Sequence, residues 1–362
     1  MDKCCVIIVV GDRMDTKLFS INSEKMDKVA LKEAGDIIKK GGLVAFPTET
    51  VYGLGGDALN RESSKKIYAA KGRPSDNPLI VHISCMEDLE AIVKSIPKEA
   101  KALAEAFWPG PLTMIFEKSD KVPFETTGGL STVAVRMPKD AIALEFIRNS
   151  GGYVAAPSAN ISGKPSPTLA KYVMEDMAGR IEAVIDGGEA VIGLESTIVD
   201  LTGEAPMILR PGYITREMLL NVLDRVDEDK TMMTVAEGVQ PKAPGMKYRH
   251  YAPKGQLTII SGESDRVVET INELSKNAME QGKKTGVIAT DENVSLYCAD
   301  VIKNAGTRED ETAIAKELYR ILREFDDEDV EVIYSESFEE SGIGQAIMNR
   351  LLKAAGHHIE YV

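Results

Sequence analysis

Two short segments hold the residue types best suited to chemistry, and both lie between residues 46 and 82. The first, residues 47–55, places hydroxyls, a carboxylate and glycines in one turn after an apolar strand (PTETVYGLG). The second carries Lys71 and Arg73 beside a loop bounded by Pro74 and Pro78. Glycine lets a backbone approach a ligand closely, and fixed cations suit phosphate groups. The two segments therefore predict a site that holds a small polar substrate next to a nucleotide.

Further polar loops follow strands in the same part of the chain. Besides residues 47–56, we expect such loops at residues 155–168 and 193–200, which are rich in Ser, Thr, Asn and Gly. Ligands of open α/β sheets gather where strands end, so these three loops are expected to converge. Each loop alone could equally be a turn whose hydroxyls bond to their own backbone.

The charge balance argues for a local anion site and against a broad basic surface. The chain has 362 residues and a formal net charge of −14, which is unfavourable for general nucleic-acid binding. Several basic residues nevertheless stand in Gly- and Pro-rich loops: Lys71, Arg73, Arg136, Lys164, Arg210, Lys247 and Arg249. In an acidic protein this placement favours a site for a small anion.

Several common kinds of site have no counterpart in the sequence. There is no GxxxxGK[ST] phosphate loop, and the glycines at 53–56 do not complete a dinucleotide fingerprint. The four histidines do not have metal-ligand spacing, so no protein metal site is expected; from its spacing alone, His82 is interpreted as a core histidine. No nucleophilic triad stands out either. The chemistry is therefore expected to rest on positioning and electrostatics.

The cysteines and apolar segments predict a cytoplasmic protein without a membrane anchor. None of the four cysteines forms a CxxC pair, which fits a reducing compartment. The apolar run at residues 4–10 is too short to span a bilayer, and we interpret it as a buried edge strand.

Hydrophobic periodicity predicts an α/β fold with a mixed sheet in the first part of the chain. Helices are expected at residues 26–40, 62–71 and 97–107. Strands are expected at residues 43–46, 79–83, 112–117, 132–136, 153–156, 183–185, 196–200 and 207–209. Because strands and helices do not alternate strictly, we expect a twisted, mixed sheet with helices packed against it.

The composition changes near residue 221, and a second domain is expected beyond it. Residues 221–254 have little periodicity and several prolines, as in a linker or a functional loop. After them, strands at 256–261, 285–289 and 330–334 alternate with helices at 264–281, 311–326 and 343–355. This alternation predicts a small parallel α/β domain. We therefore divide the chain into residues 1–220, a linker or lid at 221–254, and residues 255–362.

The motifs together resemble the YrdC-like family in its long, two-domain form. The resemblance extends over roughly residues 26–362. It rests on the motifs PTETVYGLG, KGRP, NPLIVH, WPGPLT, VRMP, PSAN, EST, LRPG and APGMKYRHYAP, which begin at residues 47, 71, 77, 108, 135, 157, 195, 209 and 243. It implies a twisted open sheet around a large cavity, followed by a Rossmann-like domain.

The resemblance also implies a nucleotidyltransferase reaction. L-threonine, bicarbonate and ATP would give threonylcarbamoyl-AMP and pyrophosphate, with Mg²⁺ on the β- and γ-oxygens of ATP. A separate complex would then transfer the threonylcarbamoyl group to the adenosine beside the anticodon of tRNA. Two anions meet in such a reaction, so cations must offset their repulsion.

The resemblance also implies roles for individual residues within the motifs. Lys71 and Arg73 are implied as catalytic residues that also contact the triphosphate. The threonine and bicarbonate side is implied to comprise Thr50, His82, Thr132, Arg136, Ala156 and Ser196. The nucleotide side is implied to comprise Asn77, Ser158, Asn160, Ser166, Arg210 and Tyr251 together with the two cations. Tyr251 would belong to a lid formed by residues 221–254.

Two alternatives stand beside this interpretation. One is a non-enzymatic, RNA-binding or ribosome-associated YrdC-like module, against which the net charge of −14 argues. The other is a carbamoyl-adenylate enzyme of hydrogenase maturation, which resembles this chain in its YrdC-like part but carries cysteine-rich zinc fingers that are not in this sequence.

Overall fold

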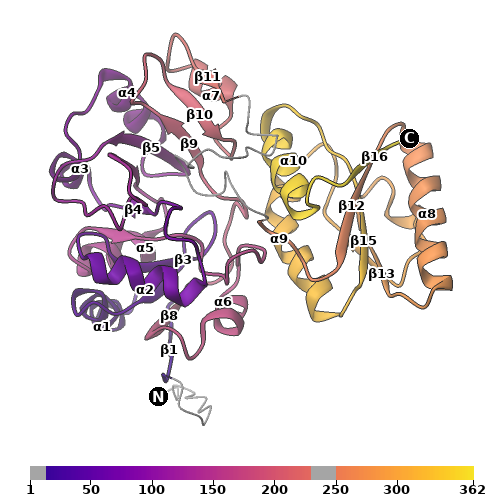
Figure 1. The fold of residues 1–362 in the computed structure, drawn as a ribbon, viewed down its shortest axis with the longest axis horizontal. Helices are drawn as coiled ribbons and strands as arrows, with labels where there is room; N and C mark the ends of the chain where they lie inside the picture. Colours follow the sequence, from indigo (N-terminus) through magenta and orange to yellow (C-terminus); the bar gives the residue numbers. More distant parts are fainter. Residues whose placement is uncertain (1–13, 230–249) are drawn as a thin grey trace.

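Two α/β units follow each other along the chain in the computed structural model, which describes residues 14–229 and 250–362 (Figure 1). Each unit has its own sheet, and the main apolar cluster of the C-terminal unit also includes Val51 and Leu194 of the first unit. The strand expected at residues 4–10 and most of the expected lid lie outside the described residues. No helix among the described residues is long and apolar enough to cross a membrane.

The first unit is built on an eleven-stranded mixed sheet, which confirms the predicted fold class. The strand order is β1-β8-β2-β3-β7-β4-β6-β5-β9-β10-β11. The bounds are β1 Lys17–Ser20, β2 Val44–Phe46, β3 Gly53–Asp57, β4 Ile80–His82, β5 Leu112–Glu117, β6 Thr132–Arg136, β7 Val154–Ala155, β8 Ala183–Asp186, β9 Thr197–Asp200, β10 Met207–Arg210 and β11 Asp227–Glu228. Strand β11 pairs with β10, so this sheet continues past residue 220, whereas the division of the chain at 220 and 254 stays a prediction.

Strand β3 lies where the sequence predicted only a polar loop, because its glycines give no alternating side-chain pattern. It pairs antiparallel with β2 and with β7 and so joins the two halves of the sheet. Only residues without a side chain allow the strands to pack this closely. A Cβ atom on Gly55 would lie 2.9 Å from Val154 Cγ1 and 3.0 Å from the Val44 carbonyl oxygen.

Within residues 14–229, seven helices accompany this sheet, and the three predicted from periodicity are present. The bounds are α1 Lys28–Lys39, α2 Arg61–Lys71, α3 Met86–Ile92, α4 Lys98–Phe107, α5 Ala141–Asn149, α6 Ala170–Met177 and α7 Arg216–Leu220. Helix α2 begins at the cap Asn60, whose side chain accepts from the Glu62 N–H, and ends at Gly72 in the left-handed region (φ 61°). Lys71 is thus the last residue of a helix.

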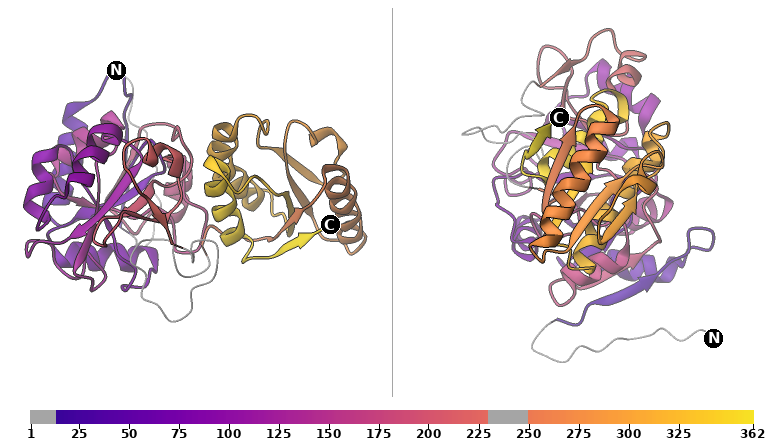
Figure 2. Two further views of the ribbon diagram at one scale, coloured as in Figure 1. Left: turned by 90° about the horizontal axis from the view of Figure 1, so that it is seen from above. Right: turned by 90° about the vertical axis from the view of Figure 1, so that its right-hand side faces the viewer.

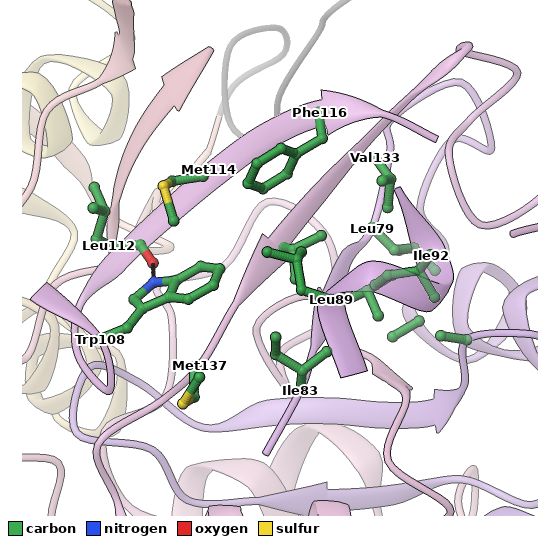
Figure 3. Close-up of a cluster of buried hydrophobic side chains, with 14 of the residues drawn as sticks. Leu79, Ile83, Leu89, Ile92, Trp108, Leu112, Met114, Phe116, Val133 and Met137 are labelled. Atoms are coloured by element: carbon green, nitrogen blue, oxygen red, sulfur yellow. Dashed lines mark hydrogen bonds between the residues drawn. The ribbon is translucent and has the colours of Figure 1, made fainter. Parts of the chain in front are cut away.

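A buried apolar cluster holds the central strands β4, β5 and β6 in place (Figure 3). Leu112, Met114 and Phe116 of β5 contribute to it from one face of that strand, as the period-2 alternation of a strand requires. The Trp108 indole N–H donates to the Leu112 carbonyl at 2.7 Å, so the single tryptophan of the chain is both packed and hydrogen-bonded. The polar ends of these strands are therefore fixed by a rigid core.

The C-terminal unit is a parallel sheet with helices on both faces, as the sequence predicted. Its strand order is β14-β13-β15-β12-β16, and every pairing is parallel. The elements are β12 Gln256–Ser261, α8 Ser264–Glu280, β13 Thr285–Ala289, the 3₁₀ turn η1 Val294–Leu296, β14 Val301–Asn304, α9 Glu311–Asp327, β15 Val332–Glu336, α10 Gly342–Ala354 and β16 Ile359–Tyr361. Strand β15 begins and ends two residues later than expected.

Helices α9 and α10 lie between this sheet and the first unit, whereas α8 covers the outer face (Figures 1 and 2). Two arginines of these helices reach across to buried carboxylates of the first unit. Arg323 pairs with Asp176 at 2.7 Å, and Arg350 pairs with Glu195 at 3.0 Å. The two units therefore share a polar, buried contact as well as apolar packing.

Candidate active site

A cavity lies where the three polar loops come together. Residues from both predicted substrate sides line it: Thr50, His82, Arg136, Ala156 and Ser196 from the threonine side, and Arg73, Ser158, Arg210 and Tyr251 from the nucleotide side. Other lining residues are Thr48, Val51, Tyr52, Gly53, Ile80, Pro157, Glu195 and His250. The cavity thus has a hydroxyl-rich part and an arginine-rich part in one continuous space.

Strand pairing brings the residues of the threonine side together. The parallel pair of β4 and β6 places His82 opposite Arg136, and the antiparallel pair of β5 and β6 places Thr113 opposite the same arginine. Thr113 in turn shares a 2.7 Å hydrogen bond with the Ser196 hydroxyl, which lies just before β9. Four segments distant in sequence therefore meet at one end of the sheet.

Arg136 is buried and held in one orientation by three contacts. Its Nη2 atom lies 2.9 Å from Glu49 Oε1, Nη1 donates to Thr50 Oγ1 at 2.8 Å, and Nε donates to the Gly110 carbonyl at 3.3 Å. A guanidinium fixed in this way needs no reordering when it meets a carboxylate. The arrangement suits the recognition of an amino acid's carboxylate.

His82 is a neutral member of the cavity wall. Burial, with the nearby Arg136 cation, lowers the pKa of His82 to about 3. Its Nδ1 atom lies 3.2 Å from the Ile80 carbonyl oxygen, which is a hydrogen bond in the tautomer that carries the proton on Nδ1. His82 is therefore both a buried, hydrogen-bonded histidine, as its spacing suggested, and a residue that lines the cavity.

Arg210 connects the two parts of the cavity. It donates from Nη2 to the Ser196 carbonyl at 2.9 Å and to the Ser196 hydroxyl at 3.2 Å. Burial lowers the pKa of the Arg210 guanidinium, which nevertheless stays charged at neutral pH. A cation fixed beside Ser196 can offset negative charge near the boundary between the two substrates.

Arg73 supplies a second fixed cation on the nucleotide side. Its Nε donates to the Asn77 carbonyl at 3.3 Å and its Nη2 to the Pro78 carbonyl at 3.2 Å. Burial lowers the pKa of Arg73 to about 10, so it is still protonated at neutral pH. The short loop that follows α2 therefore orients this guanidinium before any ligand arrives.

Lys71 lies behind the cavity wall rather than in it. Only 1 % of its surface is exposed, and Nζ donates to the Ser158 and Asn160 carbonyls at 2.5 Å each. Burial and the neighbouring Arg73 lower its pKa. In this structure Lys71 holds the loop that carries Ser158, and its direct contact with a triphosphate stays a prediction.

Three predicted nucleotide residues also stand behind the lining residues. Asn160 donates to the carbonyls of Ile161 and Lys164 and accepts from the Ser158 hydroxyl at 2.5 Å. The Ser166 hydroxyl donates to Glu195 Oε1 at 2.6 Å. The buried side-chain amide of Asn77 has no hydrogen-bond partner among the described residues, and its contact with a nucleotide stays a prediction.

Thr132 is placed differently from the other members of the threonine set. It begins β6, whereas Arg136 ends that strand, and at about 3.3 Å per residue the two lie roughly 13 Å apart. Thr132 pairs with Glu117 and is not among the residues that line the cavity. Strand direction thus argues against the role implied for Thr132, and Thr113 is the strand hydroxyl next to Arg136.

Glu195 and His250 line the cavity, although no role was expected for either. Glu195 accepts hydrogen bonds from Ser166, from the Tyr319 hydroxyl at 2.9 Å and from Arg350 Nε at 3.0 Å. Burial raises the pKa of Glu195, but the Arg350 and Arg210 cations and the Ser166 hydroxyl outweigh it and lower the pKa to about 2. Both residues lie inside the motifs that carry the resemblance. The sequence gave no reason to assign a role to Glu195, because a carboxylate is not expected to contact an anion.

Comparison with known proteins decides the family. The family described as "Telomere recombination" matches residues 36–212, and the family "Threonylcarbamoyl-AMP synthase, C-terminal domain" matches residues 214–356. The threonylcarbamoyl-AMP synthase of Pyrococcus abyssi is 49% identical over 336 residues, which cover 93% of this chain and 97% of that protein. The chain belongs to the threonylcarbamoyl-AMP synthase family.

Other relatives of the threonylcarbamoyl-AMP synthase family agree with this assignment. The Bacillus subtilis protein of the same name is 46% identical over 330 residues, 91% of this chain and 94% of that one. The crystal structure of P. abyssi Sua5 complexed with L-threonine matches with a TM-score of 0.91 and 47% identity, over 96% of this chain and 100% of that chain. These matches confirm the two-domain form and favour the enzyme over an RNA-binding module.

Proposed function

We propose that this protein condenses L-threonine, bicarbonate and ATP into L-threonylcarbamoyladenylate and releases pyrophosphate. The observation that carries the proposal is a single cavity. Arg136 and the neighbouring residues of the threonine side line it together with Arg73 and Arg210 of the nucleotide side. A carboxylate-binding part and a phosphate-binding part in one space suit the joining of an amino acid derivative to a nucleotide. Relatives at 46–49% identity bear the name of this activity.

On the threonine side, Arg136 would bind the substrate carboxylate with the remaining face of its guanidinium. Thr50 and Ser196 offer hydroxyls for the side chain, and the backbone of Ala156 completes the wall. His82 is neutral and adds no charge. The P. abyssi relative complexed with L-threonine supports threonine as the amino acid.

On the nucleotide side, Arg73 and Arg210 would contact the phosphates, while Ser158 and Tyr251 would border the nucleoside. Asn160, Ser166 and Lys71 would act by fixing these lining residues. Asn77 is buried behind them, and its amide, which has no hydrogen-bond partner among the described residues, would contact the nucleotide only if ligand binding moves the wall. Cations matter here because the carbamate and the α-phosphate are both negatively charged. Two unit charges 4 Å apart repel by about 4 kcal/mol at an effective dielectric constant of 20.

The reaction then needs no protein nucleophile. Carboxylation of the threonine amine by bicarbonate gives a carbamate and water, and a carbamate oxygen attacks the α-phosphorus. The bond to the β-phosphate oxygen breaks, and pyrophosphate leaves. The protein contributes by holding both reactants in one geometry and by offsetting their charge with Arg73 and Arg210.

Mg²⁺ is proposed to enter as part of the substrate, bound to ATP. Among residues 14–229 and 250–362, no group of three His, Cys, Asp or Glu side chains is arranged to hold a metal ion. Magnesium commonly keeps several waters and binds mainly through substrate phosphates, so a cage of protein carboxylates is not required.

The product is proposed to pass to a separate complex that modifies tRNA next to the anticodon, in the cytoplasm. The acidic charge of −14 fits a protein that leaves tRNA binding to that complex. A filter-binding titration with tRNA at physiological salt tests this division of labour: tight binding would contradict it.

The deciding experiment measures pyrophosphate release from ATP by the full chain, omitting threonine and bicarbonate in turn. Release that requires both co-substrates, together with formation of threonylcarbamoyl-AMP on a chromatogram, supports the proposal. Equal release without threonine would refute it.

A further inference from the structure

Helix α9 of the C-terminal unit packs directly against the segment that carries Glu195. Gly193, two residues before this carboxylate, has a positive φ of 81°, and a Cβ atom there would lie 2.4 Å from Lys316 Cα. Val51 and Tyr251, which line the cavity, belong to the same apolar cluster as the core residues of α9 and α10. One wall of the cavity is therefore supported by the second domain.

Polar contacts continue this support to the carboxylate itself. Tyr319 of α9 donates its hydroxyl to Glu195 Oε2 at 2.9 Å, and Arg350 of α10 donates Nε to the same oxygen at 3.0 Å. The other oxygen, Oε1, accepts from the Ser166 hydroxyl at 2.6 Å. Glu195 thus joins two helices of the C-terminal domain to a predicted nucleotide residue.

Arg350 also reaches the backbone beside Arg210. Its Nη1 donates to the Pro211 carbonyl at 2.7 Å and its Nη2 to the Glu195 carbonyl at 3.3 Å. The side chain of Arg350 has no solvent-exposed surface. A fully buried guanidinium with these partners fixes both the segment that carries Glu195 and the segment that carries Arg210.

The charge of Glu195 makes this arrangement significant for a polyanionic ligand. Glu195 lines the cavity and is ionised, so without a compensating cation it would repel the phosphates of a nucleotide. Arg73 and Arg210 would then have to offset the charge of Glu195 as well as that of the ligand. Arg350 supplies the missing positive charge from outside the catalytic domain.

We propose that Arg350 is a positioning residue of the nucleotide site: it neutralises Glu195 and, together with Tyr319, makes the C-terminal domain part of the ATP-binding wall. The inference rests on the proposed function, since it concerns ATP at the same cavity. It assigns the second domain a specific task, which is to permit a polyanion to bind beside a buried carboxylate.

Arg323 provides a matched control on the neighbouring helix. It is also a buried arginine of the C-terminal domain, and it binds Asp176 with distances of 2.7 and 3.2 Å. It donates further to the Pro165 carbonyl, and Asp176 does not line the cavity. Arg350 and Arg323 therefore share burial and interdomain pairing but differ in which carboxylate they neutralise.

The test compares Arg350→Met with Arg323→Met in the full chain. Binding of α,β-methylene-ATP by calorimetry and the separate KM values for ATP and threonine are the readouts. We expect Arg350→Met to weaken analogue binding and raise the ATP KM by at least about tenfold, because truncating one partner leaves the other charge buried and unpaired. Arg323→Met should change analogue binding by no more than about threefold.

Charge rescue separates this role from general loss of structure. Adding Glu195→Gln to Arg350→Met removes the uncompensated charge, and analogue affinity should return to within about threefold of that of the wild type. Tyr319→Phe, which removes a single hydroxyl, should weaken analogue binding by about threefold without loss of the fold. Arg350→Lys should retain more affinity than Arg350→Met.

The inference is overturned if Arg350→Met and Arg323→Met weaken analogue binding equally, or if Glu195→Gln fails to restore it. Failure of the proposed function gives a different result, because the wild type would then lack threonine-dependent pyrophosphate release. If Arg350→Met does not fold, the Tyr319→Phe result decides, and unchanged analogue binding in that variant contradicts the inference.

Discussion

Removal of Arg73 should lower catalysis strongly while the protein stays folded. Arg73 lines the cavity, and its orientation is already set by hydrogen bonds to the Asn77 and Pro78 carbonyls. A charge-assisted contact in such a desolvated site contributes about 2–4 kcal/mol to the transition state. At about 1.4 kcal/mol per factor of ten, Arg73→Ala should reduce kcat/KM roughly 30- to 700-fold.

The structural cost of the same substitution is expected to be smaller than its catalytic cost. The Asn77 carbonyl keeps a second donor, the Tyr68 hydroxyl at 3.2 Å, so mainly the Pro78 carbonyl loses a partner. One buried acceptor left unpaired costs about 1–3 kcal/mol of folding free energy. Urea denaturation should therefore still show a cooperative transition.

The assay is pyrophosphate release at saturating threonine and bicarbonate, with ATP varied. Arg61→Ala is the control, since the Arg61 side chain is 67% exposed and its one ion pair among the described residues is with Glu125 at 3.8 Å. Arg73→Lys keeps the charge but loses the planar guanidinium, so its kcat/KM should lie between those of Arg73→Ala and Arg61→Ala. Near-normal kcat/KM in a well-folded Arg73→Ala protein would refute the role of this cation.

Three further predictions concern substrate choice and pH. Valine should be a much poorer substrate than threonine, because the hydroxyls of Thr50 and Ser196 would be left unpaired beside an apolar isostere; comparable rates in the pyrophosphate assay would contradict this. The folded-state pKa of Glu195, about 2, lies below its ordinary 4.5, so its contribution to stability is present above pH 4.5 and is lost as the pH falls towards 2. That loss amounts to about 3 kcal/mol of the free energy of unfolding. In Glu195→Gln, the free energy of unfolding measured with urea should no longer fall by this amount between pH 4.5 and 2. The same pH dependence in the variant and the wild type would contradict the prediction. Because the pKa of His82 is about 3, His82 stays neutral between pH 6 and 8. His82→Asn should therefore leave the shape of the pH profile of kcat/KM unchanged in this range, even if the rate falls. If the wild-type profile shows an ionisation near pH 6.5 that the variant lacks, His82 titrates and the prediction is wrong.

Most regular elements follow from local sequence, because hydrophobic periodicity is a property of neighbouring residues. The apolar positions Ile314, Leu318 and Leu322 predicted helix α9, and all three are buried in the structure. Strand β3 was missed for the converse reason. Glycines contribute nothing to the alternation of apolar and polar side chains that indicates a strand. Their role becomes clear only from the structure, which shows the atoms that a Cβ at these positions would contact.

The motifs of the sequence determined the family and most of the residues that line the cavity, since each motif keeps its chemical groups within one turn or strand end. They implied Thr132 for the threonine side, whereas the strand register places Thr113 opposite Arg136 and Thr132 at the other end of the strand. They also gave no sign of the contact between Glu195 and Arg350, which stand 155 residues apart. Strand register and domain packing arise from long-range burial of surface, and so only the tertiary structure decides which charges meet.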